Sequence, residues 1–360
     1  MMREKLHPFH VGLLVFMVQA GVVSIFLPRM LAQYMGYNGW VSLLLFSAVA
    51  TFNIFLISVV YRLSDGKSIF QIIEQSLPKV IVFPLYTVLV SVWTLIGCIA
   101  AKQYILLFTV FVFPTTPPMY MKFLFDIIAY SLITKGIYNI SKAATVFFWM
   151  VIWTALLLLF FLKGFEWVNL TPFFFKESSD VIVGGLSIFT AFLGYELVLL
   201  LFPYVNSKKG FMSAVYFGNF LTTFIYLAIC LTCFGFYSFK QLTRMKFPLI
   251  DLLAYIRLPF VERVENIFIA LYLVSALMSI TMYIWAASET AQSLIPRASK
   301  RWITGVLVCG AFAVSWIPDV LSEVELWLKY LGYMASGIAF GLPLLLIAIL
   351  AINNGGKKLV

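Results

Sequence analysis

Long apolar runs alternate with short polar segments along almost the whole chain. Runs of about 18 or more mainly apolar residues can cross a bilayer as helices. We expect an all-α integral membrane protein with a single membrane domain over residues 1–360 and ten transmembrane helices. The predicted spans are about 9–33, 40–61, 80–111, 121–137, 143–162, 181–205, 211–237, 264–290, 302–319 and 327–352.

Two of the connecting segments are longer than the rest. The segment 163–180 carries mixed charges, and the segment 238–263 contains "FPLIDLLAYIRLPFVERVE". We expect the second to hold one or two short helices in an extracytoplasmic loop, with Pro248 at the first position of a helix, where a missing N–H does no harm.

The composition supports a membrane protein. Hydrophobic residues make up 62% of the chain and charged residues 11%, and the mean hydropathy is +1.00. Soluble domains are about 45–50% apolar and about 25% charged. The runs are also much longer than the alternating strands of outer-membrane barrels. No cleavage site of small residues follows the first run, so it predicts a retained helix.

The charges predict the orientation of the chain. The formal net charge is +10, yet no segment could form a soluble domain large enough to bind nucleic acid, so we expect no nucleic-acid partner. Most Lys and Arg residues fall in the two tails and in the loops on the same side as the tails, which join spans 2 and 3, 4 and 5, 6 and 7, and 8 and 9. Because basic residues gather in cytoplasmic loops, both termini should be cytoplasmic.

The sequence shows no enzyme, metal or cofactor signature. Cys98, Cys230, Cys233 and Cys309 lie inside apolar runs, where buried thiols behave as small hydrophobes. The two histidines lie close together near the N-terminus, away from any cysteine. We therefore expect neither catalysis nor a metal site.

The first and sixth spans share a pattern. Each has a glycine at mid-depth, Gly21 or Gly194, followed by a small or polar residue and then a proline, Pro28 or Pro203. Ten spans divide into two five-helix halves, 9–162 and 181–352, and an odd repeat unit inverts the second copy. The pattern predicts two interrupted helices in a five-plus-five inverted repeat.

An interrupted helix exposes backbone groups that can bind a ligand. The N–H groups at the start of a half-helix suit a carboxylate, and freed carbonyls can hold an ammonium group or a cation. In a membrane, such backbone must face protein or a water-filled cavity. The alternative is that each glycine only permits close helix packing, but the matched pair favours a binding site at the membrane midplane.

Glu196 lies inside an apolar run two residues after Gly194. A carboxylate there costs roughly 2.5–3.5 kcal/mol on insertion scales. The side chain could pair with Lys102 or another cation, contact a ligand amine, accept a proton, or stay protonated and hold two helices together. Gating or helix locking ranks equal with direct ligand contact.

Three stretches resemble one family: "GVVSIFLPRMLAQYMGYNGW", "FLGYELVLLLFPYV" and "DLLAYIRLPFVERVENIFIALYLV". The chain is similar to the B subunit of spore nutrient-germinant receptors, within the amino acid–polyamine–organocation superfamily. The resemblance implies a leucine-transporter-type fold in the spore inner membrane. It also implies a channel-like A subunit and a lipoprotein C subunit as partners, with a small nutrient germinant, often an amino acid, as ligand.

In this fold the ligand pocket lies between spans 1, 3, 6, 8 and sometimes 10. The resemblance places candidate residues on four spans: Ala20, Gly21, Val22, Val23 and Ser24 on span 1; Trp93 and Gly97 on span 3; Leu193, Gly194, Tyr195 and Glu196 on span 6; Met278 and Thr281 on span 8. Trp93 could equally be packing, and Thr281 could bond a carbonyl of its own helix.

Three functions compete. The first is a receptor subunit in which ligand closes the pocket and biases a partner channel. The second is a secondary transporter of amino acids or related solutes. Span 5 lacks the lysine that replaces sodium in some proton-coupled relatives, which counts against it, although Ser275 and Ser279 could supply sodium ligands. The third is a scaffold that binds nothing. The apolar candidates Trp93, Leu193 and Met278 favour a small apolar amino acid over a sugar.

Overall fold

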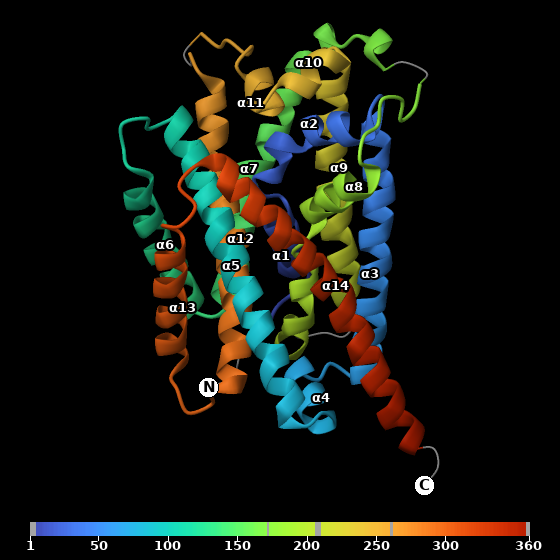
Figure 1. The fold of residues 1–360 in the computed structure, drawn as a ribbon, viewed down its shortest axis with the longest axis vertical. Coiled ribbons are helices and arrows are strands. Elements are labelled where there is room, and N and C mark those ends of the chain that lie inside the picture. The colour runs from blue at the N-terminus through green and yellow to red at the C-terminus, as the bar shows by residue number, and fades with distance from the viewer. Residues whose placement is uncertain (1–4, 171–172, 206–209, 260–261, 358–360) are drawn as a thin grey trace.

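The computed structural model describes residues 5–170, 173–205, 210–259 and 262–357, with side chains up to residue 353. The described residues form helices joined mostly by short connections, with no strand among them (Figure 1). The α-helices are α1 (Pro8–Gln19), α2 (Val23–Met35), α3 (Ser42–Ser64), α4 (Ile69–Ser76), α5 (Lys79–Phe111), α6 (Pro118–Thr134), α7 (Ile137–Ile152), α8 (Val181–Phe189), α9 (Phe211–Phe236), α10 (Phe239–Arg244), α11 (Pro248–Leu253), α12 (Val264–Leu294), α13 (Lys300–Val314) and α14 (Leu321–Lys357).

Helices occupy all ten predicted segments, but not all of them have the length of a full membrane span. Within the described residues, seven helical segments are long and apolar enough to cross a membrane. Two of them, Ile137–Gly164 and Val181–Tyr204, begin as α7 and α8 and continue as 3₁₀-helix. The bent pair α1 and α2 makes an eighth. The segments 121–137 and 302–319 form the shorter helices α6 and α13, of 17 and 15 residues.

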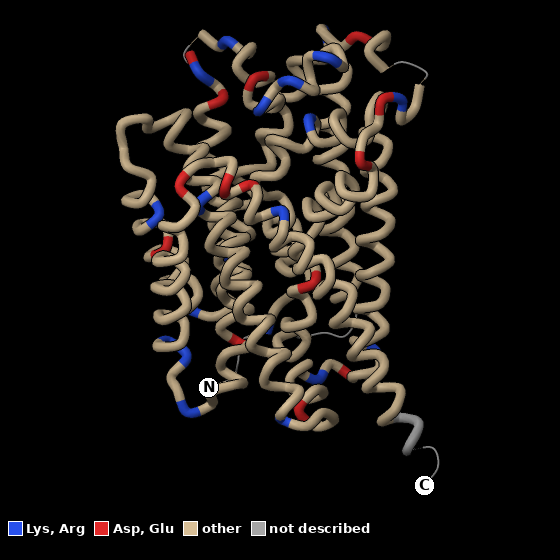
Figure 2. Tube along the Cα trace, viewed as in Figure 1, with Lys and Arg blue, Asp and Glu red and all other residues tan. Residues whose placement is uncertain are grey.

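The helices α5 and α12 form the centre of the molecule. The long helix α12 packs along α5, and α12 also contacts α1, α7, α6 and α13. α1 packs mainly against α9, α7 and α12. Large apolar side chains on the outer helix faces stay exposed, among them Ile182 and Phe220 at 88% and 66%. This is the arrangement expected of lipid-facing surfaces, and most charged residues lie toward the two ends, with a smaller group at mid-height (Figure 2).

The short helices mark the two ends. α10 and α11 lie in the segment 238–263, with Pro248 in the first turn of α11. They cover the end of α2, where the Gln33 side chain donates a 2.8 Å hydrogen bond to the Thr243 carbonyl. At the other end, Leu6 bonds the Tyr204 carbonyl through its N–H at 2.8 Å.

Close helix crossings depend on glycine. α1 and α9 meet where Gly12 faces the Ala214 carbonyl and Gly218 faces the Gly12 carbonyl. A Cβ at Gly218 would lie 2.6 Å from the Gly12 oxygen and 2.9 Å from the Val15 Cβ. Small residues let helix backbones approach closely, and that packing drives helix association in lipid.

We predict that Gly218→Ala lowers stability by about 1–3 kcal/mol, because the added methyl group forces α1 and α9 apart. The measurement is the thermal unfolding midpoint of the purified protein in detergent. Gly310→Ala on α13 is the matched control, since nothing lies within 4 Å of its Cβ position. Equal midpoints for the two variants would contradict the prediction.

Candidate functional site

The first span is interrupted, as the sequence predicts. α1 ends at Gln19 and α2 begins at Val23, and the two helices are bent by 58°. The Gly21 N–H turns back to the Gln19 carbonyl at 2.7 Å, so the regular ladder stops there. Pro28 lies inside α2 without ending it. The break therefore comes from the segment 20–22 rather than from the proline.

The sixth span is also irregular at the predicted place. α8 ends at Phe189, and a short 3₁₀ turn leads to Leu193 in an extended conformation. Gly194 has a φ of +117°, which strongly favours glycine. A ten-residue 3₁₀-helix, Tyr195–Tyr204, follows and contains Pro203. A Cβ on Gly194 would lie 2.6 Å from Val18 Cγ1, so the two interruptions touch.

Gln19 links both interruptions to α9. Its Nε2 donates to the Phe192 carbonyl at 2.6 Å and to Asn219 Oδ1 at 3.1 Å. Its Oε1 accepts from Thr222 Oγ1 at 2.9 Å. The amide is therefore satisfied at both ends, as a buried polar group must be.

Tyr226 of α9 completes this link. Its hydroxyl lies 2.7 Å from the Gln19 carbonyl oxygen and 3.1 Å from the Ala191 carbonyl oxygen. One shared donor therefore serves carbonyls of both interrupted spans. α9 holds the two breaks in a fixed relation through side chains that are fully buried.

α12 supplies hydroxyl groups to the first break. Ser275 Oγ donates to the Ala20 carbonyl at 2.5 Å, and Ser279 Oγ donates to the Val18 carbonyl at 2.8 Å. Ser24 Oγ donates to the Gly21 carbonyl at 3.1 Å. Three carbonyls around the first break are thus bonded to serine hydroxyls.

Glu196 bonds the second break to α12. Its Oε2 accepts from the Gly194 N–H at 2.6 Å, and its Oε1 accepts from the Tyr283 hydroxyl at 3.1 Å. The side chain is 3% exposed. Lys102 lies elsewhere, with its Nζ 3.2 Å from Met119 Sδ. Among the alternatives for Glu196, this geometry matches helix locking and not an ion pair with Lys102.

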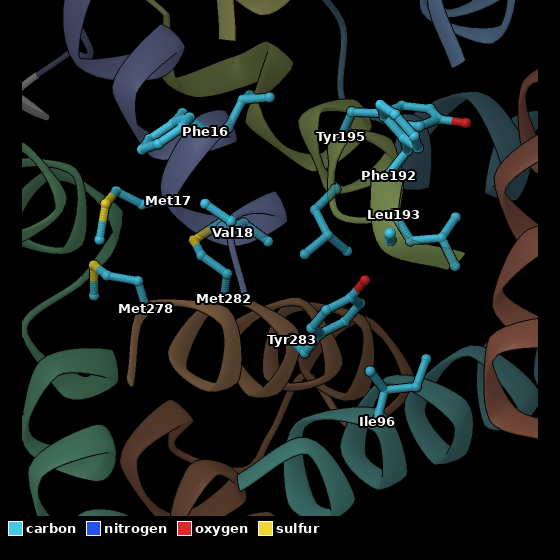
Figure 3. Close-up of a cluster of buried hydrophobic side chains, with 14 of the residues drawn as sticks. Phe16, Met17, Val18, Ile96, Phe192, Leu193, Tyr195, Met278, Met282 and Tyr283 are labelled. Atoms are coloured by element: carbon cyan, nitrogen blue, oxygen red, sulfur yellow. The ribbon is translucent and has the colours of Figure 1, made fainter. Parts of the chain in front are cut away.

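A cavity of about 130 Å³ lies between the two breaks, α5, α12 and α14. Figure 3 shows Val18 and Leu193 from the two breaks on either side of Tyr283, with Ile96 of α5 beyond. The described residues that line the cavity include no Lys, Arg, Asp, Glu or His. The polar lining residues are Gln19, Gln103, Thr190, Ser279 and Tyr283.

The predicted residues of the two breaks divide between the cavity wall and its support. Gly21, Val22, Val23 and Leu193 line the cavity. Ala20, Ser24, Gly194, Tyr195 and Glu196 lie behind this wall, and the Tyr195 hydroxyl accepts from Asn53 Nδ2 at 3.0 Å.

The predicted residues of α5 and α12 are absent from the described lining of the cavity. Trp93 is buried, and Gly97 packs against Ile284. Met278 and Thr281 are fully buried, and Thr281 Oγ1 has no hydrogen-bond partner in the described part of the chain. The lining residues of α12 are Ala276, Ser279 and Tyr283. At 100° per residue, they lie about 160° around the helix from the predicted stripe.

The sequence analysis allowed for a tenth span in the pocket but named no residue on it, and it did not name the glutamines. Leu328, Gly332 and Ala335 form one wall, and Gln19 and Gln103 supply amides. The available signal was a glutamine inside an apolar run directly before the first break. An amide there needs buried partners, which predicts a polar network at that depth.

Comparison with known proteins fits this arrangement. Residues 5–322 match the sequence model of a family described as spore germination protein, Spore_permease. The chain belongs to this spore germination protein family. It is 24% identical to spore germination protein GerQB of Bacillus cereus, covering 92% of each chain. It is 22% identical to spore germination protein A2 of Bacillus subtilis, covering 94% of this chain and 93% of the relative.

Solved structures show the fold to be transporter-like. A Na⁺-coupled sialic acid symporter, in a substrate-bound outward-open state, matches with a TM-score of 0.67 and 14% identity, covering 96% of this chain and 79% of that one. Mhp1, a nucleobase-cation-symport-1 family transporter in a closed conformation with bromovinylhydantoin bound, matches with a TM-score of 0.64 and 13% identity, covering 91% and 75%. At such low sequence identities, the likeness shows only that this spore germination protein shares the fold of these transporters.

We predict that Tyr226→Phe destabilises the protein by about 1–3 kcal/mol, because the carbonyls of Gln19 and Ala191 lose a buried donor. Tyr216→Phe on the same helix is the control, since Tyr216 is only partly buried and no hydrogen bond to its hydroxyl is seen among the described residues. Thermal unfolding in detergent measures both. Unchanged unfolding of Tyr226→Phe would show that the Tyr226 hydroxyl does not hold the breaks together.

Proposed function

We propose that this protein is the nutrient-sensing subunit of a spore germinant receptor. It binds a small germinant, an amino acid, in the cavity between the two breaks, and it signals to a channel-like A subunit alongside a lipoprotein C subunit. It acts in the spore inner membrane with both termini cytoplasmic. The observation that carries the proposal is a cavity at the junction of two interrupted spans in a member of the spore germination protein family.

The size of the cavity supports a small ligand. An apolar protein cavity of about 150 Å³ holds benzene, and this cavity is slightly smaller at about 130 Å³. A short aliphatic amino acid is of the right size, whereas a nucleoside or a disaccharide would need the walls to move apart. Val22, Leu193 and Ile96 provide apolar contacts for a short side chain.

The backbone at the first break supports a carboxylate-bearing ligand. Val22 and Val23 line the cavity at the start of α2. The first N–H groups of a helix have no partner within the helix and carry a partial positive charge. Because the described residues that line the cavity include no cationic side chain, this helix start is the natural partner for the carboxylate of the ligand.

The proposed architecture is five plus five spans in inverted repeat, with residues 9–162 and 181–352 as the two halves. α6 and α13 complete the count of ten as short spans. The matched positions of the breaks and the transporter-like neighbours support this arrangement.

Signalling requires that the ligand bind one conformation more tightly than another. The cavity is lined by both breaks, α5, α12 and α14. A ligand that draws α14 and α5 against the breaks would therefore change the outer surface of the protein. That change is the signal that a partner channel would sense.

A working secondary transporter is the second candidate, and both reported structural neighbours favour it, since both are transporters. The bonds of Ser275 and Ser279 to the break carbonyls weigh against a sodium ion there, since these hydroxyls already satisfy the oxygens that such an ion would bind.

We predict that Ala335→Phe raises the germinant concentration needed for half-maximal spore germination by at least about tenfold, which corresponds to about 1.4 kcal/mol of lost binding. Ala335 lines the cavity and is 2% exposed, so the phenyl group fills the ligand space. Gly341→Phe on the same helix is the control, because nothing lies within 4 Å of its Cβ position. A wild-type dose response for both, at equal protein levels, would refute the pocket assignment.

Uptake of radiolabelled L-alanine and other small amino acids into proteoliposomes separates receptor from transporter. For a receptor we expect binding, seen as a thermal shift, without accumulation inside the vesicles. Accumulation against a gradient that is lost in Ala335→Phe would establish the transporter instead. A thermal-shift screen with amino acids, sugars and nucleosides identifies the ligand class in the same preparation.

A further inference from the structure

A second, larger chamber lies outside the inner cavity. It has a volume of about 330 Å³ and lies between α2 and the start of α14. It shares four lining residues with the inner cavity: Val23, Gln103, Thr190 and Leu328. Gln33 also lines it and bonds to Thr243 of α10. The chamber thus leads from the end covered by α10 to the inner cavity.

The two chambers differ in charge. The inner cavity has no charged side chain among its described lining residues, whereas Arg29, Glu325 and Lys329 line the outer chamber. All three are half-buried. Arg29 comes from the half-helix that follows the first break, and the two others come from successive turns of α14, four residues apart.

Among the described residues, these three charges form no ion pair within 4.0 Å. Within the described part of the chain, ion pairs within 4.0 Å join Lys122 with Asp126, Arg263 with Glu265, and Lys300 with Glu289. Glu325 Oε1 is buried and has no hydrogen-bond partner among the described residues. Elsewhere in this protein, buried carboxylates are bonded, as Asp126 is to Lys122 at 2.5 Å. An unpaired carboxylate in a partly desolvated chamber is unfavourable unless a ligand supplies a positive charge or a hydrogen-bond donor to it.

We propose that the outer chamber is a second binding site, for a small zwitterion that carries a carboxylate and an ammonium group. Arg29 and Lys329 bind the carboxylate, for which the guanidinium fork of Arg29 is suited. Glu325 binds the ammonium group. An α-amino acid has both charges on one carbon atom and is small enough for a chamber of about 330 Å³.

The outer site extends the proposed function. Binding at the outer site does not depend on that function, but transfer of the ligand from there to the inner cavity rests on it. A zwitterion held at Arg29 and Glu325 lies at the entrance to the neck formed by the four shared residues. Release from these side chains delivers it to the inner cavity, where the half-helix start replaces Arg29 as the partner of the carboxylate. The charges of the outer chamber therefore select ligands that are zwitterions, and the volume of the inner cavity selects ligands that are small.

Thiol protection tests the outer site directly. Met30 lines the chamber and has an apolar side chain, so Met30→Cys places a reporter there. Cys309 is exposed and is replaced by Ala, whereas Cys98, Cys230 and Cys233 are buried and stay. A negatively charged methanethiosulfonate labels the reporter in detergent-solubilised, full-length protein. Gln241→Cys on α10 is the control, since its side chain is exposed and lies outside the chamber.

Glycine is the zwitterionic probe, with acetate and methylammonium as its two halves. A site with a Kd of about 1 mM is about 90% occupied at about 10 mM glycine, so labelling of Met30→Cys should slow about tenfold. Each half-probe should protect less, and Gln241→Cys should label at an unchanged rate. Arg29→Gln and Glu325→Gln should each abolish the protection. Equal protection in these variants, or none in the parent, overturns the proposal.

Ala335→Phe separates this proposal from the proposed function. Protection that persists in Ala335→Phe supports an outer site that binds independently of the inner cavity. Protection lost in Ala335→Phe shows that glycine acts from the inner cavity, which overturns the outer site and leaves the proposed function standing. Persistent protection together with a wild-type germination response of Ala335→Phe spores supports the outer site while the proposed function fails.

Discussion

The structure depends on the hydrogen bonding of backbone groups that two interrupted helices leave open inside the membrane. Water cannot satisfy them there, so other parts of the protein must. Gln19 and Tyr226 serve the carbonyls of both breaks, Ser275 and Ser279 serve the first, and Glu196 caps the second. Because these bonds run to α9 and α12, the breaks are fixed relative to both helices, and the cavity between them has a rigid floor.

The two ends of the molecule differ: polar bonds join the segments at one end, and two chambers lie toward the other. At one end, Leu6 bonds to Tyr204, whose hydroxyl lies 3.2 Å from Glu289, and Glu289 pairs with Lys300. At the other end, α2, α5 and α14 line two connected chambers. The cavity is therefore reached from the side of α10. A ligand contacts α5 and α14 as well as the fixed breaks, and movement of α5 and α14 against the breaks is the physical basis for a signal.

Charge is distributed in a way that fits this division. Lys122 and Asp126 neutralise each other between packed helices, where an unpaired charge would be costly. Glu196 is held by two hydrogen bonds and joins η5, the 3₁₀-helix Tyr195–Tyr204, to α12. In the outer chamber, by contrast, Arg29, Glu325 and Lys329 face a shared space. Among the described residues they form no ion pair. Ionisable groups of this kind within a membrane region mark functional sites by default.

The sequence by itself determined the membrane class, the helical segments and the positions of both breaks. Bilayer thickness fixes the length of an apolar run, and Gly21 and Gly194 act on their own backbone, so both signals are local. Only the tertiary structure decided that α12 turns Ser279 and Tyr283, and not Met278 and Thr281, toward the cavity, and that α14 forms a wall. Lipid and protein interior are equally apolar, so a membrane helix carries little periodic signal of which face is buried. That choice, and the neighbours of Glu196, follow from how the helices pack.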